Sequence, residues 1–197
     1  MGHFAFILQP MGLKIVATYL LAFCFFAIPA FTQGGLWRAK NGKVQFRSDA
    51  PLETITAESK TLAGAIDPSK KTFAFSVRIN SFEGFNSDIQ KVHFLENYME
   101  EKQFPQGTFE GKIIEDIPFD VPGEYTVRAK GMLTIHGISK ERIIKGTIHV
   151  TKNELHIDTH FTIPLTDHGI TIPKIVMQKI AEEIDVTIDI RFAREKV

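Results

Sequence analysis

The histidines are the side chains of this chain best suited to hold a metal ion, because imidazole is a common metal ligand. His156 and His160 share one face of a predicted strand, but four residues of extended chain separate them by about 13 Å, too far to share one ion. A two-residue turn at 152–153 would place His149 directly opposite His156 on the outer face of the sheet, close enough to chelate. No third ligand is evident beside this pair, so we predict no metal site.

Catalytic groups are no better represented. Nucleophilic catalysis needs a nucleophile beside a base and an orienting acid, and other hydrolases need two carboxylates in a cleft. The nearest approach is His93 with Glu96 on one face of a predicted helix, near Ser81 or Ser87. This set does not complete a catalytic arrangement, and we predict that the protein is not an enzyme.

Composition narrows the chemistry further. Cys24 is the only cysteine and lies in the apolar N-terminal segment, so the rest of the chain has no disulfide, thiolate nucleophile or cysteine metal site. The chain has 23 basic and 23 acidic side chains, and no basic block stands out. Nucleic acid is therefore not an expected partner.

Residues 1–33 have the features of a secretory signal peptide. Lys14 precedes an apolar run from 15 to 31 that breaks at Pro29 and is followed by small and polar residues. The run is a little short for a spanning helix of about 20 residues, although a retained anchor is the alternative. Cleavage after Ala30 or after Gln33 would leave a mature domain, taken as residues 34–197, that we expect to be periplasmic or secreted.

Alternation of apolar and polar residues predicts a meandering antiparallel sheet with one wet face. Turn signals divide the pattern into eight strands, at about 43–48, 53–66, 71–82, 108–115, 124–136, 142–150, 155–163 and 184–192. A short amphipathic helix should begin near Asn86 or Ser87 and end before Phe104, and a second should cover 174–182 after Pro173. The predicted fold is mainly β: an eight-stranded antiparallel barrel with one or two short helices, closed because closure removes exposed strand edges.

The predicted two-residue turn at 152–153 also fixes which side chains face the barrel interior. Val150 would face Leu155, and Ile148 would face Ile157, which puts the large apolar residues inside. Several inward positions are small: Gly64, Gly111, Ala129, Gly131 and Gly146. These positions either leave room for a ligand, are filled by neighbouring phenylalanines, or mark bulges and bends.

Two motifs resemble the YceI-like lipid and polyisoprenoid-binding family. Residues 93–113, HFLENYMEEKQFPQGTFEGKI, fit the pattern HFxENYxExxxFPxxxFxGxI, and residues 131–137, GMLTIHG, fit GxLTIHG. The resemblance extends from about Trp37 to Phe192 and implies a lipocalin-like barrel that encloses a long isoprenoid tail. His136, within the second motif, is interpreted as a hydrogen-bonding residue at a strand end.

With this resemblance, the interior is predicted to be a ligand tunnel. Its lining is expected to comprise Phe73, Phe75, Val77, Phe109, Ala129, Gly131, Leu133, Gly146, Ile148, Ile157, Phe161, Val186 and Ile188. Candidates for the mouth or for contact with a ligand head group are His93, Asn97, Asp167 and His168.

The predicted function is that of an exported protein that holds a long apolar amphiphile, such as a polyisoprenoid or a quinone-type lipid, with no other cofactor. The alternative is a structural or stress-protective envelope protein with a packed, ligand-free core that acts through protein contacts. A homodimer and other envelope proteins are further candidate partners. The sequence does not indicate which end of the barrel is open.

Overall fold

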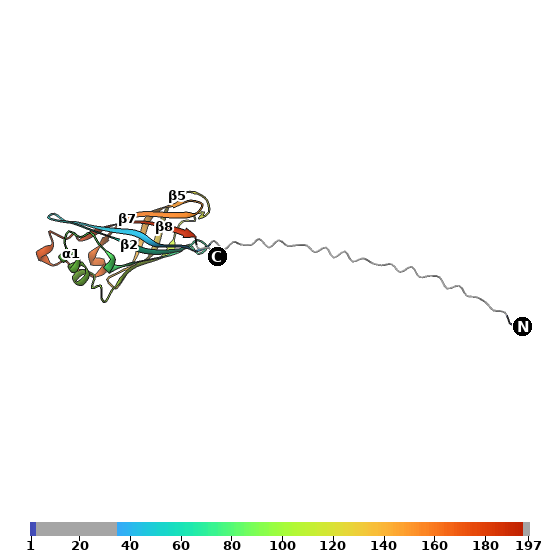
Figure 1. Ribbon diagram of the computed structural model, residues 1–197, viewed down its shortest axis with the longest axis horizontal. Helices are drawn as coiled ribbons and strands as arrows, with labels where there is room; N and C mark the ends of the chain where they lie inside the picture. Colours follow the sequence, from blue (N-terminus) through green and yellow to red (C-terminus); the bar gives the residue numbers. More distant parts are fainter. Residues whose placement is uncertain (3–34, 195–197) are drawn as a thin grey trace. The chain divides into compact units, whose positions relative to one another are not determined.

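The computed structural model describes residues 1–2 and 35–194 of the 197-residue chain, and its ribbon is shown in Figure 1. The predicted signal peptide falls on residues outside the described part, apart from its first two. Eight strands form a closed barrel in which each strand pairs antiparallel with the next and β8 pairs with β1. The strands are β1 Trp37–Asp49, β2 Thr54–Asp67, β3 Thr72–Arg78, β4 Gln106–Ile113, β5 Gly123–Ile135, β6 Ile138–Val150, β7 Glu154–Pro164 and β8 Glu183–Arg194. The predicted fold class is confirmed.

The register of β6 and β7 is the one that the turn predicted. Val150 pairs with Leu155, Ile148 with Ile157, and His149 with His156. Because side chains alternate across a strand, this register places the aliphatic pairs inside the barrel and the histidine pair outside.

One helix separates β3 from β4. The α-helix α1, Asp88–His93, continues as a π turn, η2, Phe94–Tyr98. Ser87 is its N-cap, with its side-chain oxygen accepting from the backbone N–H of Gln90. Asn86, the other predicted cap, instead donates from Nδ2 to the carbonyl of Thr54 at 3.0 Å, which ties the start of α1 to β2.

The prediction of a second helix at 174–182 is wrong. The structure has only a short 3₁₀ turn there, η4, Lys174–Val176, and two others elsewhere, η1 Ile79–Ser81 and η3 Leu165–His168. Beyond η4 the amides of Lys179 and Ile180 both donate to the carbonyl of Val176, which makes turns and not a continuous helix. The same segment is tied to the β1–β2 hairpin: the carbonyl of Gln178 accepts from Leu52, and the amide of Ala181 donates to Ser48 Oγ. In the described residues, no helix has the length and hydrophobicity needed to cross a membrane.

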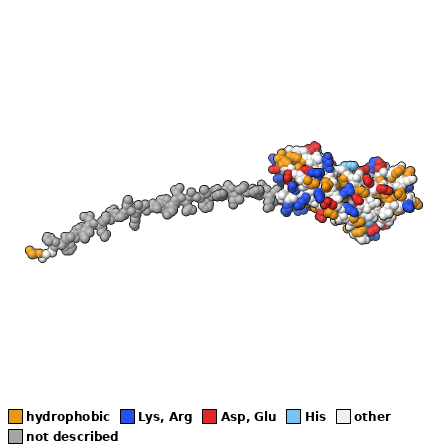
Figure 2. All heavy atoms as spheres, turned by 180° about the vertical axis from the view of Figure 1, so that it is seen from behind, with side chains coloured by type: hydrophobic (Ala, Val, Ile, Leu, Met, Phe, Trp, Pro, Cys, Tyr) orange, Lys and Arg blue, Asp and Glu red, His pale blue; other side chains and the backbone are white. Residues whose placement is uncertain are grey.

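The two ends of the barrel differ in packing. At one end, which we call the closed end, Trp37, Ile66, Leu155 and Phe192 are at most 1% exposed. Trp37 pairs with Ile66, and Leu155 pairs with Phe192, so the four side chains come from neighbouring strands. At the other end lie α1, the tip of the β1–β2 hairpin and the segment before β8 (Figure 1). Basic and acidic side chains are interspersed over the barrel surface seen in Figure 2.

Candidate functional site

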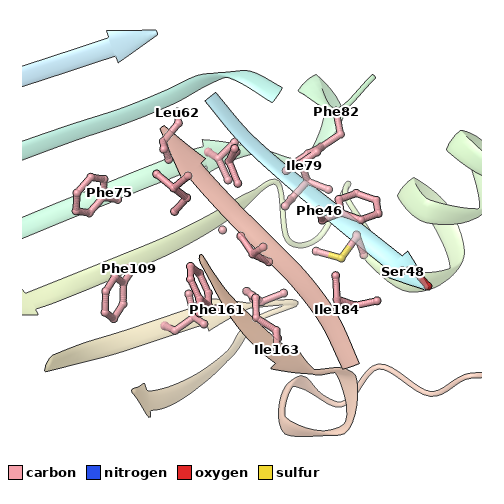
Figure 3. Close-up of a pocket in the computed structure, with 18 of the residues that line it drawn as sticks. Phe46, Ser48, Leu62, Phe75, Ile79, Phe82, Phe109, Phe161, Ile163 and Ile184 are labelled. Atoms are coloured by element: carbon pink, nitrogen blue, oxygen red, sulfur yellow. The ribbon is translucent and has the colours of Figure 1, made fainter. Parts of the chain in front are cut away.

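The barrel encloses an apolar cavity of about 580 Å³. All eight strands contribute inward-facing side chains to its wall. Figure 3 shows Phe75, Phe109 and Phe161 pointing into the same space from three strands, with Ser48 near the end of β1. A volume of this size falls within the range of about 300–1,000 Å³ that small-molecule pockets occupy.

The phenylalanines of the wall indicate how the interior is filled. Phe75, Phe109 and Phe161 face inward but are only partly buried, whereas Phe192 at the closed end is 1% exposed. Rings that face a packed core lose nearly all of their exposed surface, since interiors are close-packed. The interior is therefore packed at the closed end and hollow along the rest of its length.

Twelve of the thirteen residues predicted to line a tunnel do line this cavity. They are Phe73, Phe75, Val77, Phe109, Ala129, Leu133, Gly146, Ile148, Ile157, Phe161, Val186 and Ile188. Their contact with a ligand stays a prediction. The sequence reasoning did not select the wall residues nearest the helix, among them Phe46, Phe82, Phe85 and Phe94, whose rings pack within 6 Å of one another as pairs.

Gly131 is the predicted lining residue that the cavity wall does not include. It lies directly opposite Gly111, where the backbones of β4 and β5 approach closely. A Cβ atom on Gly131 would lie 2.2 Å from the carbonyl oxygen of Glu110. The reason for glycine here is therefore the approach of another backbone, as is common for glycine within strands, and not room for a ligand.

The cavity opens at the end of the barrel that carries α1. We define the mouth by Ile89 and His93 of α1 and by Val176, Lys179 and Ile180 before β8, all of which line the cavity. Ile89 is 58% exposed although it is apolar, so it lies at the boundary between the cavity and solvent.

The charged groups in the cavity wall lie at this end. Glu53, just before β2, accepts a hydrogen bond at Oε1 from Nε2 of Gln90, and both residues line the cavity. Deeper in the barrel, Thr159 is a polar wall residue whose hydroxyl donates to the carbonyl of Lys145 at 2.7 Å. The cavity thus offers an apolar interior and a polar rim, which suits a molecule with a long apolar part and a polar head.

The four predicted mouth residues have different positions. His93 lines the cavity at the mouth. Asn97 is exposed on η2 but is not part of the cavity wall. Asp167 is also outside the wall, and its carboxylate accepts from Arg142 at 3.2 Å.

His168 is not at the mouth, and its prediction as a head-group contact is wrong. Its side chain is fully buried, and Nδ1 donates to the carbonyl of Ile138 at 3.0 Å. Burial lowers the pKa of His168, against the opposing effects of that carbonyl and of Asp167. The residue therefore joins η3 to the start of β6 as a neutral side chain.

The second sequence motif is a structural feature of the β5–β6 hairpin. His136 and Gly137 form its two-residue turn and both have positive φ, 50° and 71°, as a type I′ turn requires. The ring of Phe104, from the first motif, packs edge-on against His136 with centroids 5.0 Å apart. His136 also bonds the carbonyl of His168 through Nδ1 at 3.2 Å, as expected for a hydrogen-bonding residue at a strand end.

The fold and its cavity define a closed, lipocalin-like eight-stranded barrel with an apolar interior. The family model of the YceI-like domain matches residues 38–192, and the chain belongs to this family. No curated protein matches the sequence.

Solved structures of low sequence identity share the fold. A polyisoprenoid-binding domain from Saccharophagus degradans, implicated in plant cell wall breakdown, superposes with a TM-score of 0.68 at 12% identity over 82% of this chain and 99% of that one. BcnA of Burkholderia cenocepacia gives a TM-score of 0.63 at 16% identity, over 76% and 95% of the two chains. The YCEI protein of Campylobacter jejuni gives 0.55 at 20% identity, over 71% and 84%.

Proposed function

We propose that this protein is an exported carrier that holds one long apolar lipid, of the polyisoprenoid or quinone type, inside the barrel. The observation that supports this proposal is the hollow interior, because a cavity of about 580 Å³ with an apolar wall excludes water from anything that fills it. Family membership and the likeness to a polyisoprenoid-binding domain favour the same ligand class.

The shape of the cavity suits a chain more than a compact molecule. On β7 alone, wall residues run from Ile157 to Ile163, six residue steps or about 20 Å of strand. A hydrocarbon tail has no hydrogen-bonding groups to satisfy, and its burial contributes about 0.8 kcal/mol per methylene before ordering costs are subtracted. Affinity would therefore come mainly from tail length.

The polar rim favours one orientation of the ligand. The tail would point toward the closed end, where Trp37 and Phe192 end the interior, and the head group would lie at the mouth. Gln90, His93 and Lys179 would supply donors to a head group there, and Glu53 an acceptor.

Binding without catalysis fits the same arrangement. Ser81, which the sequence suggested as a nucleophile near His93, bonds through its hydroxyl to Ser59, Thr61 and the carbonyl of Arg78. None of these partners is a base that could activate it. The packed, ligand-free core that the alternative function needs is disfavoured by the cavity, and homodimer or envelope-protein partners stay predictions.

A chain-length series tests the proposal. Delipidated protein is titrated with isoprenoid alcohols and quinones of increasing tail length, and binding is followed by the displacement of a fluorescent fatty-acid probe from the cavity. The affinity should rise at least tenfold per added isoprene unit until the cavity is filled and then level off, because each unit buries several methylene groups. Equal affinity for short and long tails would contradict the proposal.

Export is tested separately, since it depends on residues 1–33. The full chain is expressed in a double-membrane bacterium, and the N-terminus of the protein in the periplasmic fraction is sequenced. We expect the chain to start at residue 31 or 34. A full-length protein that remains in the membrane fraction would favour the retained anchor.

A further inference from the structure

A separate group of polar side chains lies outside the cavity, on the outer face of β6 and β7. His149 and His156 are directly opposite in the ladder, and their rings stack with centroids 5.4 Å apart. Asp158 follows His156 by two residues and so lies on the same face. Its Oδ2 is 2.7 Å from His149 Nε2. The third ligand that the sequence analysis did not find is thus present beside the histidine pair.

The three side chains have the geometry of a metal site. One ligand atom from each of His149, His156 and Asp158 lies within 4.8 Å of the others. In a tetrahedral zinc site, with metal–ligand distances near 2.1 Å, ligand atoms are about 3.4 Å apart. The strand pairing holds the two backbones in place, so small side-chain rotations would bring the ligand atoms from within 4.8 Å to about 3.4 Å of one another. Three protein ligands would leave one position for water.

The surroundings favour a cation. Glu124 lies opposite His149, with Oε2 3.6 Å from Nδ1. Asp189 lies opposite Asp158, and its Oδ1 is 3.1 Å from His156 Nε2 without hydrogen-bond geometry, so that buried nitrogen has no hydrogen-bond partner. With Asp158, these residues put three carboxylates around two imidazoles.

The basic residue opposite His156 is already paired with a carboxylate. Arg191 lies opposite His156 on β8, and its Nη1 contacts Glu154 Oε1 at 2.7 Å. Carboxylates next to ligating histidines orient the rings and raise their basicity, and their removal typically weakens metal binding by 10- to 100-fold. Glu124 and Asp189 are placed to have this role.

We propose that His149, His156 and Asp158 bind one divalent transition-metal ion, for which zinc is the best match. Two imidazoles with one carboxylate suit zinc, whereas calcium and magnesium prefer oxygen ligands alone. None of the three residues lines the barrel cavity. The site is therefore a surface metal site that joins β6 to β7, independent of lipid binding.

The test is a zinc titration of the untagged protein in competition with a chromophoric chelator. We expect one zinc per chain and a higher melting temperature, because the ion binds the folded state. His149→Gln, His156→Ala and Asp158→Asn should each weaken binding at least tenfold. His160→Ala is the matched control, since His160 is also on β7, pairs with Asp185 at 3.4 Å, and is not part of the cluster. It should leave the affinity unchanged.

Three results would overturn the proposal. Unchanged affinity in Asp158→Asn would show a histidine pair without a third ligand. An equal loss in His160→Ala would show non-specific binding to surface histidines. Cobalt, used as a visible probe, should give the intense absorption of a tetrahedral complex, and the weak spectrum of the hydrated ion would contradict it. Circular dichroism of the metal-free variants checks folding, and their retained lipid should equal that of the wild type.

Discussion

Replacement of Ala129 by leucine tests most sharply whether the interior is hollow. Ala129 lines the cavity from β5 and is only partly buried. Ala74 on β3 is exposed, next to Phe73, which faces inward, so it lies on the outer face of the barrel. Ala74→Leu is therefore a matched control: it makes the same change in a strand of the barrel, but the side chain faces solvent instead of the cavity.

A hollow interior and a packed interior predict opposite signs for the change in unfolding free energy caused by Ala129→Leu. In a hollow barrel the three added carbons enter empty space, and their burial contributes up to about 2 kcal/mol at 0.8 kcal/mol per methylene. Ordering the new side chain takes back about 0.5–1 kcal/mol. In a packed core the same change forces neighbours apart and costs about 1–3 kcal/mol.

The assay is urea unfolding of delipidated protein, followed by the fluorescence of Trp37, which is 1% exposed at the closed end. We expect Ala129→Leu to be as stable as the wild type or up to about 1.5 kcal/mol more stable, and to retain less lipid because the leucine occupies ligand space. Ala74→Leu should change the unfolding free energy by no more than about 0.5 kcal/mol and should leave the amount of retained lipid unchanged. A loss of more than about 1 kcal/mol in Ala129→Leu alone would refute the hollow interior.

Two further predictions concern stability. Gly131→Ala should lower the free energy of unfolding in urea by about 1–3 kcal/mol, because its Cβ would lie 2.2 Å from the Glu110 carbonyl oxygen. Gly107→Ala is the control: its nearest contact is at 3.6 Å, so it should stay within about 1 kcal/mol of the wild type, and equal effects of the two variants would contradict the backbone explanation. His168 has a lowered pKa because it is buried, so below its unfolded pKa of about 6.5 the unfolded state takes up the proton first, and stability falls with acidification by up to about 1.4 kcal/mol per pH unit. His168→Gln should remove this part of the pH dependence below the unfolded pKa of about 6.5, as measured by unfolding at each pH, and an unchanged slope would show that other groups cause it.

The wall of the barrel was predictable because strand alternation records which face is buried. One turn at 152–153 fixed the pairing of Val150 with Leu155, and parity then carried the inward face through the other strands. Twelve of the thirteen lining residues follow from that parity. Parity cannot distinguish a small residue that leaves room from one that permits a close backbone approach, and Gly131 was misassigned for this reason.

The mouth depended on tertiary contacts that no local pattern contains. The 174–182 segment has a helical start signal in Pro173, yet its backbone bonds to Leu52 and Ser48 of the β1–β2 hairpin. His168 was expected at the surface of a loop, but it is the buried last residue of η3 and is bonded to the start of β6. The position of the 174–182 segment against the β1–β2 hairpin determines which end of the barrel is open, and this position depends on tertiary contacts.

The measurement that tests the central claim most directly is native mass spectrometry of the protein purified from a bacterial periplasm without detergent, followed by organic extraction of the bound material. We predict one adduct per chain, with the mass of an isoprenoid or quinone-type lipid, that is retained in Ala74→Leu and reduced in Ala129→Leu. A ligand-free mass for protein that also fails to take up added polyprenyl lipids would contradict the account.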